Sequence, residues 1–463
     1  MKQLTRDVAV VGAGTAGAAA ALAFARRGAS VVVVDRRPDG RTGARWIDSV
    51  PLWCFERAGI DAPSGDELFN AEHGRLVLHP AGRGALFSVE SNAVAHIDVP
   101  RVVARMLRQA YARGVERVTA GVVDARFDAE VATLTLDTGA AITSKLVIDA
   151  SGLRGAIRRR SPALAAACPE PGPEDLCLAS TWTYDVKDKD AAIRFIRRYG
   201  AEPGDVVALP GLAGGYSTLT VFTLRSMTEI CVLAGSIPAL GYPPGPKLLA
   251  SFEARADWLG TRKTGGQGAI PLRRPYATLG RDRVALVGDS ACQVFASHGS
   301  GVGMGVVAAD LLAAAASSTR DPGGPTALAT YERTFHRELG GLLASADAFR
   351  RFSSALPIDD LVSLVRTGIL DGDIALPAME QRRTRLDLAQ LRRTAGRAVR
   401  APRLSSRFAA PALRTLALGA LCDWMAPPAT PRARQAWESL IETLIGPRPS
   451  AVSPTLVELP HFG

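Results

Sequence analysis

The sequence has few of the residues that metal, disulfide and dithiol redox sites require. Its six cysteines lie far apart without a C-x-x-C pair, and there are only six histidines in 463 residues. A zinc site or redox motif of the usual spacing is therefore excluded, and no metal site is predicted. We interpret the cysteines as reduced thiols of a cytoplasmic protein. With 47% hydrophobic and 22% charged residues, the chain is ordinary globular material, long enough for two or three domains.

Long apolar segments are scarce as well. One charge-free stretch, Val8 to Ala25, covers 18 residues and resembles a signal peptide or a short membrane span. Gly12, Gly14 and Gly17 interrupt it, however, and a spanning helix would not carry a strand-like run followed by a glycine-rich bend. We therefore interpret the stretch as a buried strand, a turn and a helix.

Lysine is rare, and the positive charge is concentrated in one segment. Of the 55 basic residues 49 are arginine, and the net charge of the chain is +10. Residues 382–434 hold 12 arginines and two acids, which is 12 − 2 = +10, so the rest of the chain is neutral. A nucleic-acid-binding protein is not indicated. The segment is a candidate surface for an anionic membrane or an acidic carrier protein, or else a solvated basic face.

The first motif is a dinucleotide-binding turn. Asp7 to Val11 predicts a buried strand, Gly12-Ala-Gly-Thr-Ala-Gly17 a tight turn, and the alanine-rich residues that follow a helix. The glycines permit the turn, the approach of a pyrophosphate and close packing of helix and strand. The helix N-terminus offers N–H groups to phosphates, and Asp35, 18 residues past Gly17, is placed to accept hydrogen bonds from a ribose. This turn alone does not separate FAD from NAD.

Two later segments repeat the strand-and-turn pattern. Lys145 to Gly152 predicts a third buried strand and its turn, and Arg283 to Asp289 predicts a fourth strand, followed by a glycine-rich loop and a helix. Asp289 can hold a ribityl hydroxyl. Backbone N–H groups near Gly301 to Gly303 can face the electron-poor edge of a flavin ring.

Together the three motifs resemble the FAD-dependent oxidoreductase superfamily that includes para-hydroxybenzoate hydroxylase, aromatic monooxygenases, geranylgeranyl reductases and tryptophan halogenases. The resemblance covers roughly residues 1 to 350. It implies an α/β fold with a Rossmann-like FAD-binding domain, an inserted antiparallel-sheet substrate domain and a C-terminal helical region. The implied domains are 1–175 and 264–352 for FAD, 176–263 for the substrate sheet and 353–463 for the helical region.

The resemblance also implies the cofactor contacts. We expect FAD to be bound by Gly12, Gly14, Thr15, Ala16, Gly17, Asp35, Arg36, Arg45, Arg101, Gly288, Asp289, Gly301, Val302 and Gly303. Hydroxylases of the superfamily carry an Asp where this chain has Ser151, and that motif helps them to dock NADPH. The hydride donor therefore stays open between NAD(P)H used directly and a separate flavin reductase.

The branch of the superfamily is the next question. Halogenases need a lysine between the first turn and the helix near Arg101, and no lysine lies between Lys2 and Lys145. A geranylgeranyl-reductase-like enzyme acting on a C=C bond of a prenyl or alkene substrate is compatible with Ser151, although that branch's Tyr-x-Trp-x-Phe-Pro motif is absent. A monooxygenase that works through a flavin C4a-(hydro)peroxide needs few dedicated acid–base side chains.

We therefore expect a cytoplasmic flavoprotein of secondary metabolism, an FAD-dependent monooxygenase of a small hydrophobic or aromatic metabolite. A C=C reductase is the alternative, and a non-catalytic flavin-binding interaction protein is the third possibility. His298, in the loop expected at the flavin, is the candidate proton donor or substrate-orienting group. Trp182, Tyr216 and Phe222 are candidates for the substrate pocket, with Tyr184 beside them.

Overall fold

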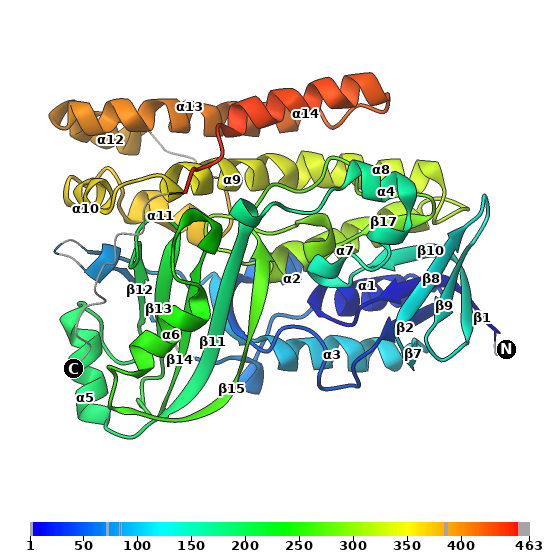
Figure 1. Cartoon of the computed structure of the whole chain (residues 1–463), viewed down its shortest axis with the longest axis horizontal. Coiled ribbons are helices and arrows are strands. Elements are labelled where there is room, and N and C mark those ends of the chain that lie inside the picture. Colours follow the sequence, from blue (N-terminus) through cyan, green and yellow to red (C-terminus); the bar gives the residue numbers. More distant parts are fainter. Residues whose placement is uncertain (1–2, 71–73, 83, 85, 384–387, 452–463) are drawn as a thin grey trace.

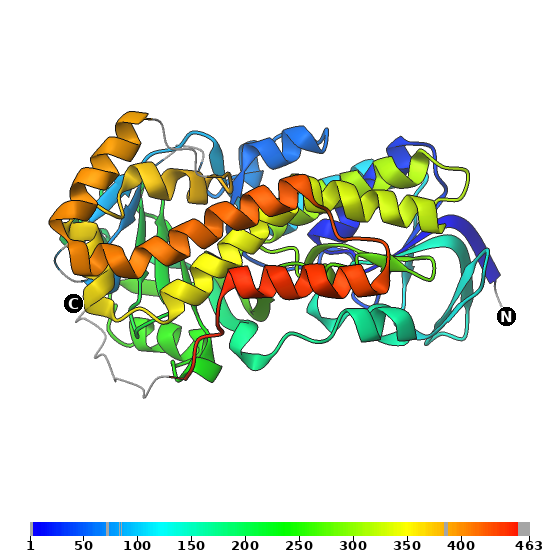
Figure 2. The same cartoon turned by 90° about the horizontal axis from the view of Figure 1, so that it is seen from above.

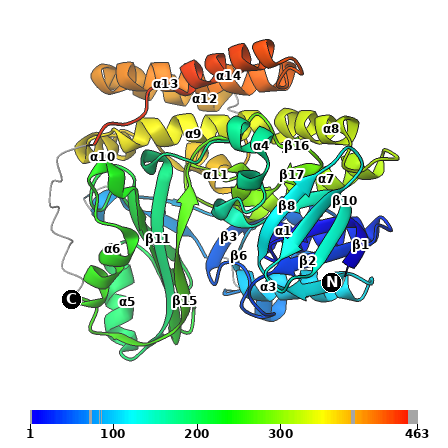
Figure 3. The same cartoon turned by 45° about the vertical axis from the view of Figure 1, so that its right-hand side comes forward.

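The computed structural model describes residues 3–70, 74–82, 84, 86–383 and 388–451. Two large β-sheets lie side by side, and helices of the C-terminal third are stacked along one side of both (Figures 1 and 3). The fold class expected from the sequence is confirmed: a Rossmann-like sheet, an antiparallel-rich sheet and a helical C-terminal region.

The first sheet carries the dinucleotide turn. Its strand order is β16-β17-β10-β1-β2-β7, with β9 beside β10 and β8 beside β9. The neighbours from β17 to β7 run parallel, and the apolar centres of β17, β10, β1 and β2 are buried, as parallel strands covered on both faces require. The strands are Gln3–Val11 (β1), Val31–Asp35 (β2), Glu116–Thr119 (β7), Val122–Phe127 (β8), Ala132–Leu136 (β9), Ala141–Asp149 (β10), Gly280–Arg281 (β16) and Val284–Leu286 (β17).

Three helices pack with this sheet and with one another. They are α1 (Thr15–Arg26), α3 (Val99–Tyr111) and α7 (Val302–Ser317), and α1 contacts both of the others. The short helix α2 (Leu52–Arg57) contacts α7 and the strand after residue 46, and the short helix α4 (Pro162–Ala167) contacts β16. A separate two-stranded sheet, β3 (Ile47–Pro51) with β6 (Val94–Asp98), connects this region to the second sheet.

The second sheet has the order β15-β11-β14-β13-β12-β4-β5. Helices α5 (Lys189–Arg198) and α6 (Gly245–Glu253) supply apolar side chains to the cluster on one of its faces. The sheet also includes two strands from the N-terminal part of the chain and continues past residue 263 through β15, so its strands extend beyond 176–263. The strands are Leu76–Leu78 (β4), Phe87–Val89 (β5), Leu176–Val186 (β11), Val206–Pro210 (β12), Ser217–Thr223 (β13), Glu229–Ser236 (β14) and Leu259–Pro271 (β15).

The C-terminal helices form two layers. Helix α9 lies beneath α13 and α14, and Figure 2 shows these two as the outermost elements on that side. Helices α11 and α12 of this region are separated near Gln381, where the backbone φ is 49°. The helices are Pro325–Phe335 (α8), Gly341–Ser354 (α9), Ile358–Arg366 (α10), Gly372–Met379 (α11), Leu388–Arg400 (α12), Pro402–Trp424 (α13) and Pro431–Ile445 (α14).

Candidate functional site

The turn after β1 has room for a ligand but not for side chains at two of its glycines. Gly12 has φ +104°, and a Cβ there would lie 2.3 Å from the carbonyl oxygen of Ala150. A Cβ on Gly17 would lie 1.9 Å from the carbonyl oxygen of Gly12. Gly14 caps α1 with no side-chain hydrogen bond, so the first N–H groups of this helix, at Thr15 and Ala16, remain open to an anion.

Asp35 lies at the end of β2 beside this turn. Its carboxylate accepts the N–H of Ala13 at 2.8 Å and the N–H of Arg37 at 2.8 Å. These two bonds fix the orientation of the carboxylate next to the first glycines, where it was expected to meet a ribose. Arg36 is exposed just beyond it.

Of the two other candidate arginines, one lies near the turn and one is occupied elsewhere. Arg45 is exposed in the loop whose Gly43 packs against Gly14. Arg101 instead forms ion pairs with Asp66 and with Asp98 at the start of α3, with half of its side chain exposed. The structure therefore gives Arg101 acidic partners at the surface, an arrangement that its place at the head of a helix did not reveal.

The two predicted FAD motifs meet at Ala16. A Cβ on Gly288 would lie 2.9 Å from the Cβ of Ala16, and a Cβ on Gly305 would lie 3.1 Å from it. The first turn of α1, the turn after β17 and the start of α7 are thus in contact. This is the carboxyl edge of the parallel strands, where dinucleotides bind in open α/β sheets.

The N-terminus of α7 lies close to Asp289. Gly301 caps this helix without a side-chain hydrogen bond, and a Cβ on Gly301 would lie 3.3 Å from Oδ1 of Asp289. Val302 and Gly303 form the first turn, and Gly303 is pressed against Cys54. Unpaired N–H groups and a carboxylate therefore lie side by side, which suits a ribityl chain and the edge of a flavin ring.

Asp48 is a site residue that sequence reasoning missed. It lies in β3, and its carboxylate accepts a hydrogen bond from the hydroxyl of Ser300 at 3.1 Å. Burial raises the pKa of Asp48 to about 6, and the nearby charge of Asp289 adds to the effect. Burial alone raises the pKa of Asp289 to about 6. The signal that could have found Asp48 is an acid directly after the first, apolar residue of a short strand.

Tyr216, just before β13, reaches the loop that carries His298 and leads into α7. A Cβ on Gly299 would be 3.6 Å from the hydroxyl of Tyr216, which makes no hydrogen bond with any other described residue. Burial raises the pKa of Tyr216 well above its usual range, so the phenol stays protonated. The side chain of His298 is exposed, while desolvation by the surrounding residues lowers its pKa to about 4, so its imidazole is neutral at pH 7. The structure thus places a protonated phenol against Gly299, the residue that follows His298.

The strands of the second sheet divide the other aromatic candidates. Phe222 points to the inner face, where it is buried against Ile47 and Cys231. Trp182 points to the outer face and packs beside Tyr184, with the guanidinium of Arg262 4.9 Å from its ring. Successive side chains of β11 point to opposite faces of the sheet, so Trp182 and Tyr184, two positions apart, both point to the outer face. The assignment of these two residues to the substrate pocket is therefore corrected.

A partly exposed strip crosses the inner face of this sheet between two hydrophobic clusters. Cross-strand pairing aligns Leu233, Thr220, Ala208 and Leu78 on β14, β13, β12 and β4, and all four are partly exposed. Tyr216, itself partly exposed, packs against the cluster on one side, and Phe222 belongs to the cluster on the other. The strip is apolar apart from one threonine, so it suits an elongated hydrophobic ligand.

The C-terminal region also reaches the site. The backbone of Ala378 in α11 hydrogen-bonds to the ring of His298. The indole Nε1 of Trp53 donates to the carbonyl oxygen of Glu380 at 2.8 Å, and Arg382 lies 5.7 Å from the Trp53 ring. Residues 378–382 thus cover one side of the site, although the motifs that carry the family resemblance end near residue 350.

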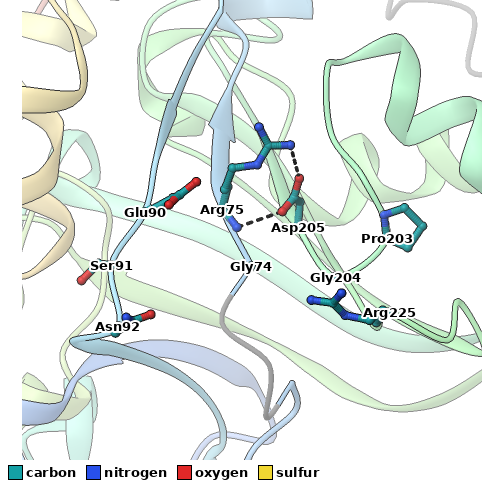
Figure 4. A pocket seen from close by; sticks show the side chains of 9 residues that line it. All are labelled: Gly74, Arg75, Glu90, Ser91, Asn92, Pro203, Gly204, Asp205 and Arg225. Carbon is teal, nitrogen blue, oxygen red and sulfur yellow. Dashed lines mark hydrogen bonds and ion pairs between the residues drawn. The ribbon is translucent and has the colours of Figure 1, made fainter.

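A polar cavity of about 240 Å³ opens at one end of the second sheet (Figure 4). In it Arg75 is paired with Asp205 through both its backbone N–H and its guanidinium. Glu90 and Arg225 also line the cavity, so acids and bases balance. None of its lining residues belongs to the flavin motifs.

Comparison with known proteins agrees with this arrangement of the flavin motifs. A family model described as lycopene cyclase protein matches residues 7–168. The digeranylgeranylglycerophospholipid reductase of Sulfolobus acidocaldarius is 28% identical over 410 residues, which are 84% of this chain and 86% of that protein. These similarities support the resemblance of the chain to the FAD-dependent oxidoreductase superfamily.

This FAD-dependent oxidoreductase is also similar to the ubiquinone hydroxylase UbiL of Rhodospirillum rubrum, with 28% identity over 380 residues, 75% of this chain and 82% of that protein. A geranylgeranyl bacteriochlorophyll reductase-like protein from Thermoplasma acidophilum has the same fold, with a TM-score of 0.69 at 16% identity over 87% of this chain and 100% of that one. FAD is the cofactor, and the open helix N-termini and Asp289 fit it.

The raised pKa of Asp289 gives a testable pH dependence of FAD binding. A ribityl hydroxyl donates to the ionised carboxylate, so below about pH 6 a proton must leave first, and the affinity should fall by up to about tenfold per pH unit. The stability of the cofactor-free protein depends on pH in the opposite direction to the FAD affinity. There the raised pKa favours the protonated native state, so its stabilisation is full below the ordinary value of 3.8 and is lost as the pH rises through about 6.

Titration of flavin release by fluorescence measures this dependence. Asp289→Asn should bind FAD more weakly but with a flatter pH profile, and Asp48→Asn tests the contribution of the second carboxylate. An unchanged profile in Asp289→Asn would show that this carboxyl does not contact the cofactor.

Proposed function

We propose that this FAD-dependent oxidoreductase reduces carbon–carbon double bonds of a prenyl or other alkene lipid. The observation that carries the proposal is the free hydroxyl of Tyr216, protonated and next to the loop that leads into α7. Saturating a double bond requires a hydride on one carbon and a proton on the other. Bound FAD, once reduced, supplies the hydride, and Tyr216 is the group positioned to supply the proton.

Two further features support this choice. The partly exposed strip formed by Leu233, Thr220, Ala208 and Leu78 offers an elongated, largely apolar surface for a chain-like substrate. The reductase of Sulfolobus acidocaldarius covers more of this chain than UbiL does. Neutral His298, held by Ala378, would orient the substrate or Tyr216 through a hydrogen bond.

A monooxygenase is the second candidate. The similarity to UbiL favours it, and a site enclosed by the 378–382 segment is suited to excluding water, which oxygen chemistry on a flavin requires. Its substrate would be a small hydrophobic or aromatic metabolite. The same residues would then position a ring or a chain without the need for a proton from Tyr216.

Product analysis separates the two candidates. The dithionite-reduced protein is incubated with a phospholipid carrying geranylgeranyl chains, once without oxygen and once in air, and the lipid is analysed by mass spectrometry. We expect a gain of two hydrogens per double bond without oxygen. A lipid left unchanged without oxygen but hydroxylated in air would contradict the reductase and support the monooxygenase.

A further inference from the structure

The outermost helix carries a stripe of exposed apolar side chains. Leu413, Leu416 and Trp424 on α13 are 67%, 66% and 88% exposed. With the exposed Ala409 and Ala420 they follow spacings of three and four residues, so they share one face of the helix. Leu418 and Cys422 lie on the opposite face and are buried in the cluster shared with α9 and α14. Figure 2 shows α13 lying across the top of the molecule.

Exposed arginines precede this stripe in the sequence, on α12 and in the first turn of α13. Arg392, Arg400 and Arg403 are exposed and form no ion pair with any other described residue. Val399, between them, is 80% exposed. Neighbouring arginines, by contrast, are tied down by acids of α10 and of the turn and first residues of α11: Arg393 with Asp373, Arg397 with Asp371 and Arg407 with Asp360. Residues 384–387 of the basic segment lie outside the described residues.

We propose that this face of α12 and α13 docks on the surface of an anionic lipid bilayer. Exposed tryptophan and leucine flanked by arginine are the features of a helix that lies in the membrane interface, with the apolar side chains among the acyl chains and the arginines at the lipid phosphates. Among the described residues no helix is long and apolar enough to cross a membrane. The protein therefore rests on the bilayer through this face.

The charge and the apolar length of this face favour a bilayer over a second copy of the chain or an acidic carrier protein. A second copy of the chain, joined through the same face, would bring the exposed arginines Arg392, Arg400 and Arg403 of both copies together, and like charges facing each other oppose association. An acidic carrier protein would satisfy the arginines, but the apolar stripe runs over 16 residues of α13, from Ala409 to Trp424, and suits a continuous apolar layer. The inference stands apart from the proposed reaction, although it would bring the enzyme to where prenyl lipids reside.

Vesicle cosedimentation tests the docking. The flavin-loaded protein is mixed at low salt with vesicles of equal parts phosphatidylcholine and phosphatidylglycerol, and separately with pure phosphatidylcholine. We expect binding to the acidic vesicles that weakens as salt is added. No binding to acidic vesicles at low salt, or equal binding to pure phosphatidylcholine, would overturn the proposal.

Two variants test whether the vesicles bind to this face of α12 and α13. Arg392→Gln, Arg400→Gln and Arg403→Gln together should weaken binding on the order of a hundredfold, about fivefold per arginine. Leu416→Ser with Trp424→Ser should weaken it at least about tenfold. The matched control is Val123→Ser with Arg126→Gln, an exposed apolar and basic pair on β8 at the other end of the molecule (Figure 1).

Other results of these experiments would assign this face of α12 and α13 to a different partner or to none. Binding by both variants at the level of the control would overturn the assignment to this face. Concentration-dependent dimerisation that is lost with Trp424→Ser would assign the face to a second copy instead, and tight binding to an acidic carrier protein without vesicle binding would assign it to a carrier. Flavin content and lipid reduction in detergent should be unchanged in both variants, so loss of docking is distinguishable from failure of the proposed reaction.

Discussion

Gly14→Val is expected to yield a folded protein that no longer retains FAD. Gly14 has φ −74° and extended ψ, a conformation that valine adopts without strain, and a Cβ there would lie 3.5 Å from its nearest neighbour, the Cα of Gly43. The polypeptide therefore tolerates the side chain. The pyrophosphate must approach this backbone closely, however, and the isopropyl group would occupy its place.

The expected loss of affinity is roughly tenfold to a hundredfold or more, the range for forcing extra atoms into a filled site. Flavin absorbance after gel filtration measures retention, and circular dichroism with thermal unfolding measures the fold. Gly396→Val, on an exposed part of α12 with nothing near its Cβ, is the matched control. A yellow Gly14→Val protein with unchanged affinity would mean that the cofactor does not lie against this turn.

Tyr216→Phe is expected to retain FAD and to lose turnover by about a hundredfold to ten-thousandfold, the usual contribution of a positioned proton donor. The substitution removes one hydroxyl that makes no hydrogen bond with any other described residue, so neither folding nor flavin binding depends on it. The ring itself, packed in the cluster with Trp46 and Ile270, stays in place.

Separate measurement of flavin reduction and of lipid reduction tests this role. Reduction of the bound flavin by dithionite should be unaffected in Tyr216→Phe, whereas transfer to the lipid should slow. Tyr242→Phe is the matched control, since Tyr242 belongs to the same cluster. Equal rates of lipid reduction in Tyr216→Phe and the unmodified protein would remove Tyr216 from the reaction.

The cofactor site could be predicted from the sequence because its parts are local. Gly12, Gly17 and Asp35 lie on one strand–turn–helix–strand unit, and the Gly288-Asp289 turn follows directly from its strand, so spacing along the chain carries the geometry. In the structure the turn after β17 and the start of α7 both contact Ala16. The placement of Asp289 next to Gly301 follows from the same short loop.

Residues brought in by packing could not be predicted in this way. Asp48 reaches the site because β3 pairs with β6 and Ser300 folds back onto it, a contact across 252 positions of sequence. Ala378 reaches His298 from a helical region where the family pattern gives no guidance. Trp182 and Tyr216 were grouped as aromatic residues of one sheet, but strand parity decides which face each one occupies.

Electron accounting without oxygen tests the central claim most directly. The protein is loaded with FAD, reduced with a single equivalent of dithionite and mixed anaerobically with a geranylgeranyl phospholipid, while flavin absorbance is followed. If the enzyme is a C=C reductase, the flavin should reoxidise without oxygen, and one double bond should be saturated per flavin. A flavin that stays reduced until oxygen is admitted, with no saturated lipid formed, would contradict the account.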